Sequence, residues 1–173
     1  MTEDLVARLR DPDPEVRAFA AYYLKNLGGE DAIEPLIVAA GDPEPSVRQA
    51  AVHSLAVLGF RTKQGRVLSH VEYALDDESP DVRKEAAMAF GAWLAGMVDG
   101  ERTIRSLIRR LKDPDPEVAE RAAFALENIY ERAGRYDLAR PLLEAQDDGD
   151  ADIRKKAREI LAKKVRMADE RPL

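Results

Sequence analysis

The chain of 173 residues has no cysteine and only two histidines, His53 and His70. The absence of cysteine excludes disulfides, thiol catalysis and thiolate metal sites. Two isolated histidines are also too few for the usual ligand sets of histidine and carboxylate. The sequence therefore predicts no metal site and no cofactor.

Motifs of membrane insertion and of catalysis are missing as well. No apolar run reaches the length that spans a bilayer, and the start Met1-Thr2-Glu3-Asp4 is acidic rather than basic. We therefore expect a cytoplasmic protein that makes no contact with a membrane. There is no Gly-rich phosphate loop before a lysine and no Gly-x-Ser-x-Gly elbow, so we expect that the protein is not an enzyme.

Asparagine and glutamine are scarce, whereas charged residues make up 35% of the chain, a composition typical of thermophile proteins. The net charge is −6, and residues 1–60 hold 10 acids against 5 bases. This acidic first third argues against binding along a phosphate backbone, so nucleic acid is an unlikely partner. Apolar residues at 45% are enough to build a core.

A seven-residue motif recurs through the whole chain. It reads Asp-Pro-Asp-Pro-Glu-Val-Arg at 11–17 and returns, with changes, at 42–48, 77–83, 113–119 and 148–154. An amphipathic helix is predicted after each copy. Proline stands at its first turn in the first four copies, and Asp or Ser precedes the helix as N-cap in every copy except the second, which has the poorer cap Glu44. Counting from the Val or Ile of each motif as position 0, columns +4, +8 and +11 form its apolar stripe. Column +11 holds Leu27, Leu58, Trp93, Ile129 and Lys164.

A shorter apolar-periodic segment precedes each motif, so each unit is a helix A, a tight turn and a helix B. One such unit cannot bury its own apolar faces, and neighbouring units must stack. The pattern of an Asp-Pro turn, Val-Arg and an Ala-rich helix ending in Leu-Gly, as in residues 32–59, resembles the short HEAT-like repeats of the phycobilisome-lyase type.

This resemblance implies an all-α fold, a right-handed α-solenoid of five two-helix repeats in a single domain, 1–173. The repeats are expected at about 2–28, 30–60, 65–99, 101–134 and 137–166, with a short tail at 167–173. The resemblance also implies that the Asp and Arg of each motif form a structural ladder. Ala119 replaces the ladder arginine in repeat 4, which predicts a weak junction between repeats 3 and 4. Residues 60–66, between Gly59 and helix A of repeat 3, are predicted to be a surface loop.

Column +6 of helix B is the candidate binding site. It lies away from the apolar stripe, and in HEAT-like repeats it points into a concave groove lined by helices B, where polar residues are usual. Aromatic, methionine and imidazole groups at such a position are typical of binding hot spots, so we expect a protein partner there. Trp93, in column +11, is predicted to lie in the core. The expected groove residues are Phe19, Tyr22, His53, Val57, Met88, Phe124 and Asn128.

Two alternatives remain open at this point. The resemblance also extends to bilin lyases, so the groove could hold a tetrapyrrole. A basic stripe on helix A of repeat 4, Arg102, Arg105, Arg109 and Lys112, could bind phosphates of a nucleic acid or could be a solvated convex face.

Iron-dependent hydroxylases of related repeats use paired His-Glu dipeptides as iron ligands. Neither histidine here is followed by glutamate, so the sequence does not predict this activity.

Overall fold

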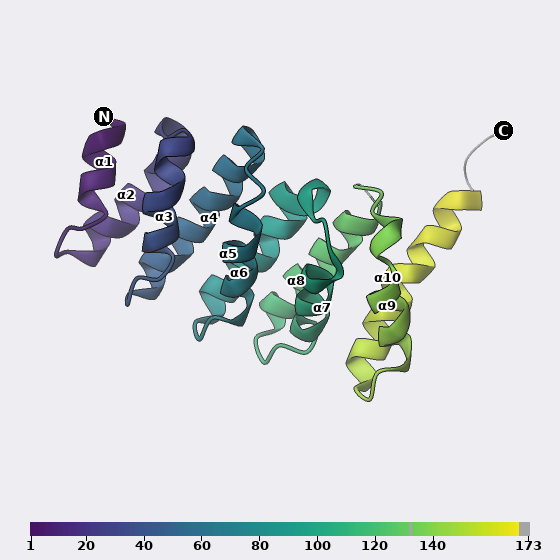
Figure 1. The fold of residues 1–173 in the computed structure, drawn as a ribbon. Helices are drawn as coiled ribbons and strands as arrows, with labels where there is room; N and C mark the ends of the chain where they lie inside the picture. Colours follow the sequence, from purple (N-terminus) through teal and green to yellow (C-terminus); the bar gives the residue numbers. More distant parts are fainter. Residues whose placement is uncertain (132, 170–173) are drawn as a thin grey trace.

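A computed structural model describes residues 1–131 and 133–169, with side chains for 1–131 and 133–162. The described part is all-α and has ten α-helices in five consecutive pairs (Figure 1). They are α1 Thr2–Arg8, α2 Pro14–Leu27, α3 Ile33–Ala39, α4 Pro45–Thr62, α5 Val67–Tyr73, α6 Pro80–Ala89, α7 Glu101–Arg110, α8 Pro116–Glu131, α9 Arg140–Glu144 and α10 Ala151–Asp169.

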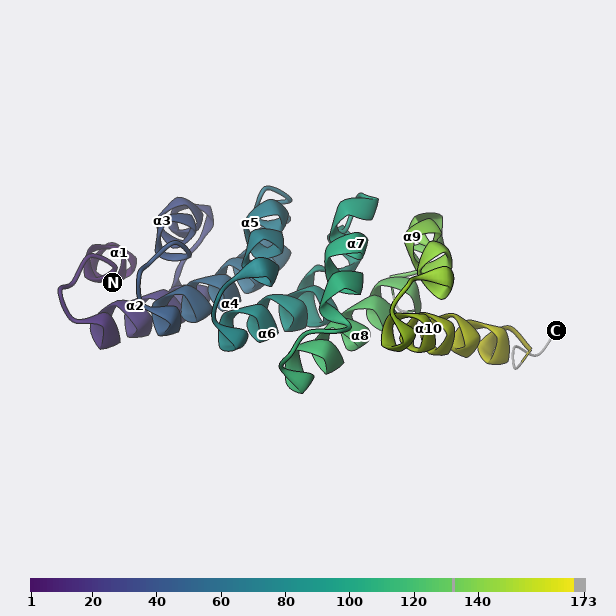
Figure 2. The same cartoon turned by 90° about the horizontal axis from the view of Figure 1, so that it is seen from below.

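The helices form two layers, seen most clearly in Figure 2. Helices A, which are α1, α3, α5, α7 and α9, lie side by side in one layer, and the longer helices B, which are α2, α4, α6, α8 and α10, lie in the other. Each helix B packs on the next one, α2 on α4, α4 on α6 and α6 on α8. The prediction of an α-solenoid built from two-helix repeats is therefore confirmed.

The motif sets where each helix B begins. Proline stands at the first turn of α2, α4, α6 and α8, where its missing N–H costs no helical hydrogen bond. The Asp13 carboxylate accepts the N–H of Glu15 at 2.9 Å, and Asp115 and Asp150 cap α8 and α10 in the same way. Ser79 was expected to cap α6, but its side chain makes no cap hydrogen bond.

The predicted loop at 60–66 is wrong in its first half. Helix α4 does not end at Gly59 but continues to Thr62, and Lys63 ends it with φ 58°. Gly59 lies inside the helix, where the side chain of Val67 from α5 approaches its backbone so closely that a Cβ would clash. The glycine therefore permits close packing of α5 on α4, and the connector is only residues 63–66. At the other end, α10 runs to Asp169, beyond the predicted end of repeat 5; residues 170–173 lie outside the described part.

The assignment of Trp93 to the core is also wrong. Residues Phe90–Leu94 continue α6 as a single π-helical turn, which adds one residue relative to an α-helix. The extra residue rotates the side chains that follow, so Leu94 is fully buried and Trp93 is 38% exposed. In the same column, Leu58 and Ile129 are buried as predicted, Leu27 is 41% exposed at the end of α2, and Lys164 lies outside the described side chains.

Arginines and aspartates of the motif link consecutive repeats into a ladder. Arg17, Arg48 and Arg83 each donate Nε and Nη2 to both carboxylate oxygens of the aspartate one repeat later, Asp42, Asp77 and Asp113, at 2.8–2.9 Å. Nη1 of each arginine donates to two backbone carbonyls of its own turn. The ladder thus ties helix B of one repeat to the turn of the next.

Burial and charge oppose one another at the ladder carboxylates. Burial alone would raise the pKa of Asp113, but the hydrogen bonds from Arg83 and from the N–H of Asp115 outweigh it, and its pKa is lowered. Asp42 and Asp77 have lowered pKa values for the same reasons. The Asp113 side chain is fully buried, which makes the Arg83 pair the most enclosed of the three.

Because each arginine reaches forward, the gap at Ala119 falls one junction later than predicted. The junction between repeats 3 and 4 keeps its Arg83–Asp113 pair, and Asp113 also meets Arg110 at 3.3 Å. Asp148, one repeat after Ala119, accepts the N–H of Asp150, and no arginine pairs with its carboxylate among the described residues. The ladder is therefore interrupted between repeats 4 and 5.

Restoring the missing arginine should stabilise this junction. Ala119→Arg should raise the free energy of unfolding by about 1 kcal/mol, because a new ion pair to the half-buried Asp148 would form. Ala119→Met, of similar length without charge, is the control, and both are measured by chemical denaturation. The gain should vanish when Asp148→Asn is added; a gain that survives this change would contradict the ladder geometry.

Removing the most enclosed arginine should have the opposite effect. Arg83→Met leaves a buried carboxylate at Asp113 and should cost about 3 kcal/mol of stability at pH 7. Arg17→Met, at a more exposed pair, should cost less. Since the ladder aspartates have lower pKa values folded than unfolded, their contribution is complete above about pH 4 and disappears as the pH falls through the folded values. Urea denaturation from pH 7 to pH 3 should therefore show the two Arg→Met variants converging on the wild type in acid.

Candidate binding surface

The exposed side of the helix-B layer carries the predicted column. Tyr22 is 46% exposed, Phe124 is 37% exposed, and His53 and Met88 are half-buried. Glu159 is exposed at the same position of α10. We call the surface formed by Tyr22, His53, Phe60, Met88, Trp93 and Phe124 the helix-B face.

A polar and aromatic network holds the first part of this face in place. The rings of Tyr22 and His53 are stacked with centroids 5.6 Å apart, and the Lys25 ammonium lies 3.4 Å from the centroid of the Tyr22 ring. Lys25 Nζ is also 2.9 Å from His53 Nε2, and His53 Nδ1 is 2.8 Å from Glu85 Oε1. Because the Lys25 ammonium can only donate, Nε2 of His53 accepts from it and Nδ1 donates to Glu85. Three successive helices B, α2, α4 and α6, are connected through one ring.

A second aromatic pair lies at the C-terminal ends of helices B. Phe60 on α4 is 40% exposed, and its ring centroid is 6.0 Å from that of Trp93. Lys63 places its ammonium 4.5 Å from the centre of the Phe60 ring. These two rings face outward because α4 extends beyond Gly59 and because the π turn rotates Trp93 out of the core.

Two of the predicted groove residues, Asn128 and Phe19, lie elsewhere. Asn128 is only 5% exposed, and its amide donates to the carbonyl of Gly91 at 3.0 Å, so it joins repeats 3 and 4 instead of facing a partner. Phe19 packs against Tyr23 with ring centroids 4.2 Å apart, on the side of α2 that faces away from repeat 2. Val57 is half-buried, as His53 and Met88 are.

Sequence reasoning missed Lys25, Phe60, Lys63, Glu85 and the exposure of Trp93. Phe60 could have been found, because column +13 lies seven residues after column +6 and therefore on the same face of a continuous helix. The prediction that the helix ends at Gly59 placed Phe60 in a loop instead of on the helix-B face. The π turn at Trp93 leaves no comparable signal in a single sequence.

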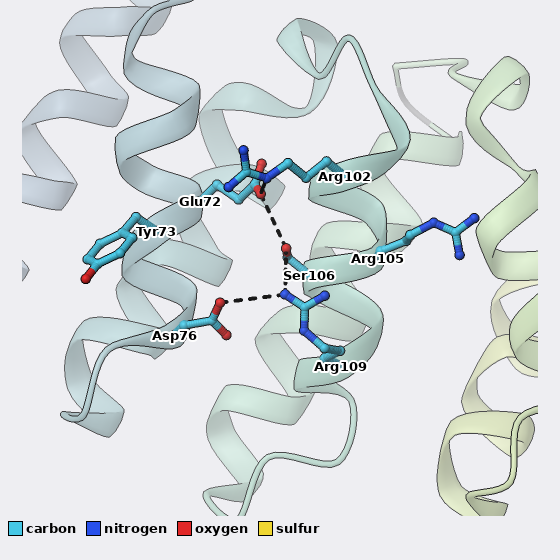
Figure 3. Close-up of a pocket in the computed structure, with 7 residues that line it drawn as sticks. All are labelled: Glu72, Tyr73, Asp76, Arg102, Arg105, Ser106 and Arg109. Carbon is cyan, nitrogen blue, oxygen red and sulfur yellow. Dashed lines mark hydrogen bonds and ion pairs between the residues drawn. The ribbon is translucent and has the colours of Figure 1, made fainter.

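The basic stripe of repeat 4 lies in the other layer, beside α5 and α9, and each of its cations meets a carboxylate. Figure 3 shows two of these pairs, Arg102 beside Glu72 and Arg109 beside Asp76. Arg102 Nε is 2.7 Å from Glu72, and Arg105 is 2.9 Å from Glu144. Arg109 lies 3.6 Å from Asp76, and Lys112 lies 3.9 Å from Asp150. A phosphate would have to compete with these carboxylates, so the geometry favours a role in joining neighbouring helices A.

The described residues contain no group of three or more His, Asp or Glu side chains placed to hold a metal ion. Among the helices of the described part, none is both long enough and apolar enough to cross a membrane. His70 is exposed on α5, away from His53.

Comparison with known proteins agrees with this architecture. The model of the HEAT repeats family matches residues 2–91 and 68–162. A search of curated protein sequences gave no significant match. Three similar solved structures share the fold at 19–23% identity.

The first of these structures is the complex of CpcE and CpcF of phycocyanin lyase from Nostoc sp. PCC7120, with a TM-score of 0.60 and 19% identity over 92% of this chain and 97% of that one. The second is an engineered protein, with a TM-score of 0.58 and 23% identity over 93% of this chain and 78% of that one. The third is a designed armadillo repeat protein in complex with the peptide (KR)4, with a TM-score of 0.56 and 23% identity over 89% of this chain and 77% of that one. At this level of identity the likeness concerns the fold.

The π turn at the end of α6 can be tested by two truncations of adjacent residues. Leu94→Ala should cost about 2–5 kcal/mol of unfolding free energy, since Leu94 is fully buried. Trp93→Ala should cost roughly 1 kcal/mol, because its ring lies at the surface. Chemical denaturation followed by circular dichroism measures both. The reverse order of the two losses would show that helix B keeps α-helical register and buries the tryptophan.

Proposed function

We propose, because the chain belongs to the HEAT repeat family, that it is a non-enzymatic protein-binding module that holds a segment of a partner protein on the helix-B face. The observation that carries this proposal is the run of exposed aromatic rings, Tyr22, Phe60, Trp93 and Phe124, contributed by four successive repeats. Large aromatic side chains on one continuous surface are characteristic of binding hot spots.

The face is also held in a defined shape before any partner arrives. Tyr22 is fixed by the His53 ring and by the Lys25 ammonium, and Phe60 is fixed by Trp93. The ring of Phe124 lies directly over Gly91 of the preceding repeat, in space that any larger residue would occupy. Side chains that are already ordered lose little conformational entropy on binding, so such a surface can bind a flexible segment with a smaller entropic cost.

The partner segment that fits this surface is basic and carries apolar side chains. The chain has a net charge of −6, and residues 1–60 contribute ten acids and five bases. On α8, Glu120 lies four residues before Phe124 and therefore on the same side of the helix. The aromatic rings of the helix-B face would contact the apolar side chains of the partner. The acidic residues around them would attract its lysine and arginine side chains and speed association.

The same geometry supports the non-enzymatic part of the proposal. His53 is the one histidine on the face, and both of its ring nitrogens are engaged, one by Lys25 and the other by Glu85. The paired cations of the repeat 4 stripe speak against nucleic acid as the main partner. The likeness to phycocyanin lyase is one of fold, and no specific contact of this chain favours a tetrapyrrole.

Trp93 is the only tryptophan and lies on the proposed surface, so its fluorescence reports binding directly. We expect the emission of Trp93 to shift when the peptide (KR)4, or the same peptide with two residues replaced by leucine, is added. The leucine-containing peptide should bind more tightly because it also fills the spaces between the rings. The acidic peptide (DE)4 is the control and should leave the emission unchanged.

Matched variants separate the face from the rest of the surface. Tyr22→Ala with Phe124→Ala should weaken binding of the leucine-containing peptide about tenfold or more while the protein still folds. Tyr73→Ala removes an aromatic ring that is 82% exposed on α5, in the other layer, and should leave binding unchanged. Equal losses in the two variants, or equal binding of basic and acidic peptides, would contradict the proposal.

A further inference from the structure

The Arg–Asp ladder is open at both ends of the solenoid. Asp11 holds the ladder position of repeat 1 and accepts the N–H of Asp13 at 2.9 Å, as the other ladder aspartates do in their own turns. No arginine pairs with its carboxylate in the part of the chain that the structure describes. At the other end, Arg154 donates Nη1 to the carbonyls of Asp148 and Gly149, at 2.7 and 3.0 Å. Its Nε and Nη2 meet no carboxylate among the described residues.

The first end of the helix-B layer carries an apolar surface where other repeats have a neighbour. Columns +3 and +7 of helix B face the preceding repeat: the Ser54 hydroxyl in column +7 donates to the Ala21 carbonyl at 2.6 Å. In repeats 2–5 column +7 is buried and holds Ser54, Ala89, Ala125 and Ile160. In repeat 1 these two columns hold Phe19 and Tyr23, which are 50% and 42% exposed and packed ring against ring. Terminal repeats normally present a polar face.

Repeat 5, at the C-terminal end of the solenoid, also exposes an apolar residue, in this case in the helix-A layer. Five residues before each ladder aspartate stands a side chain that faces the next repeat, as Ile108 does beside Pro141 of repeat 5. Ile108 is 8% exposed, whereas Leu143, at the same position of repeat 5, is 51% exposed. The two ends therefore each leave apolar surface in a position that is covered inside the solenoid.

The two terminal repeats carry a small opposite net charge. Residues 2–28 hold five acids and four bases, whereas residues 137–166 hold seven acids and eight bases. In column +5, which contacts the next repeat, repeats 1–4 hold Ala or Val and repeat 5 holds the exposed Arg158. A guanidinium in that position would meet the rings of Phe19 and Tyr23, a favourable cation–π contact.

From these ends we propose that copies of this chain stack head to tail. The last repeat of one copy lies on the first repeat of a second copy, and Arg154 of the first pairs with Asp11 of the second in the geometry of the internal ladder. Arg158 lies over the rings of Phe19 and Tyr23, and Leu143 packs against α1 of the second copy in the helix-A layer. Such a head-to-tail contact uses two different surfaces, so it does not close into a dimer but builds linear arrays whose length grows with concentration. The helix-B face stays accessible, so this inference does not rest on the proposed function.

Sedimentation velocity of the full chain over a range of concentrations tests this arrangement. The weight-average mass should rise continuously from the monomer mass of 19.3 kDa, and the rise should weaken with added salt. Phe19→Ser with Tyr23→Ser should weaken association about tenfold or more. A constant monomer mass at all concentrations, or a closed dimer that does not grow, would overturn the proposal.

Charge reversal identifies the contact itself. Asp11→Arg gives a chain with arginine at both ends of the ladder, and Arg154→Asp gives a chain with aspartate at both ends, so neither variant should associate alone. An equimolar mixture of the two should associate again, because every contact then joins an arginine to an aspartate. Asp99→Arg, in the turn between repeats 3 and 4, is the control for net charge and should associate like the wild type. Failure of the mixture to recover would show that association, if present, uses another surface.

Discussion

The forward reach of each motif arginine to the aspartate of the next repeat is the constraint on which the rest of the structure depends. One guanidinium binds two carbonyls of its own turn and both oxygens of the following carboxylate. The distance and rotation between repeats are thereby fixed by a planar, bidentate group rather than by apolar packing alone. Apolar contacts supply most of the stability, but they would allow neighbouring repeats to slide past one another. The bidentate Arg–Asp pairs do not allow such a shift.

A fixed rotation between repeats also determines which side chains remain at the surface. Column +4 is alanine in all five repeats, so adjacent helices B approach closely and leave no room for larger groups between them. Side chains in columns +6 and +13 are consequently directed outward, as those of Tyr22, Phe60 and Phe124 are. The proposed binding surface is thus a consequence of close helix packing, and its order is supplied by contacts between repeats, such as the one from His53 to Glu85.

Much of the fold could be predicted from the sequence, because it is repeated five times and each copy carries its own helix signals, as at Pro14 and Asp13. The direction of the ladder could not, since spacing alone does not show whether Arg83 serves its own turn or the next one. The predicted helix end at Gly59 was wrong for a physical reason. A glycine at a close contact between helices cannot be distinguished in the sequence from a glycine that ends a helix. The outward position of Trp93 and the burial of Asn128 both depend on the π turn of repeat 3. Trp93 lies within this turn, and Asn128 donates to the carbonyl of Gly91 in it. The π turn itself depends on tertiary packing.

The junction between repeats 4 and 5 shows what replaces the ladder where it is interrupted. With alanine at position 119, the two repeats are joined in the helix-A layer by Arg105 to Glu144 at 2.9 Å and by Arg140 to Glu101 at 2.8 Å. These pairs are largely exposed, and exposed ion pairs contribute little and weaken in salt. Repeat 5 is therefore held mainly by its apolar contacts, through Ile153, Ala157 and Ile160. Among the described residues, the repeat that carries Arg154 is therefore joined to its neighbour without the bidentate Arg–Asp pair that links repeats 1 to 4.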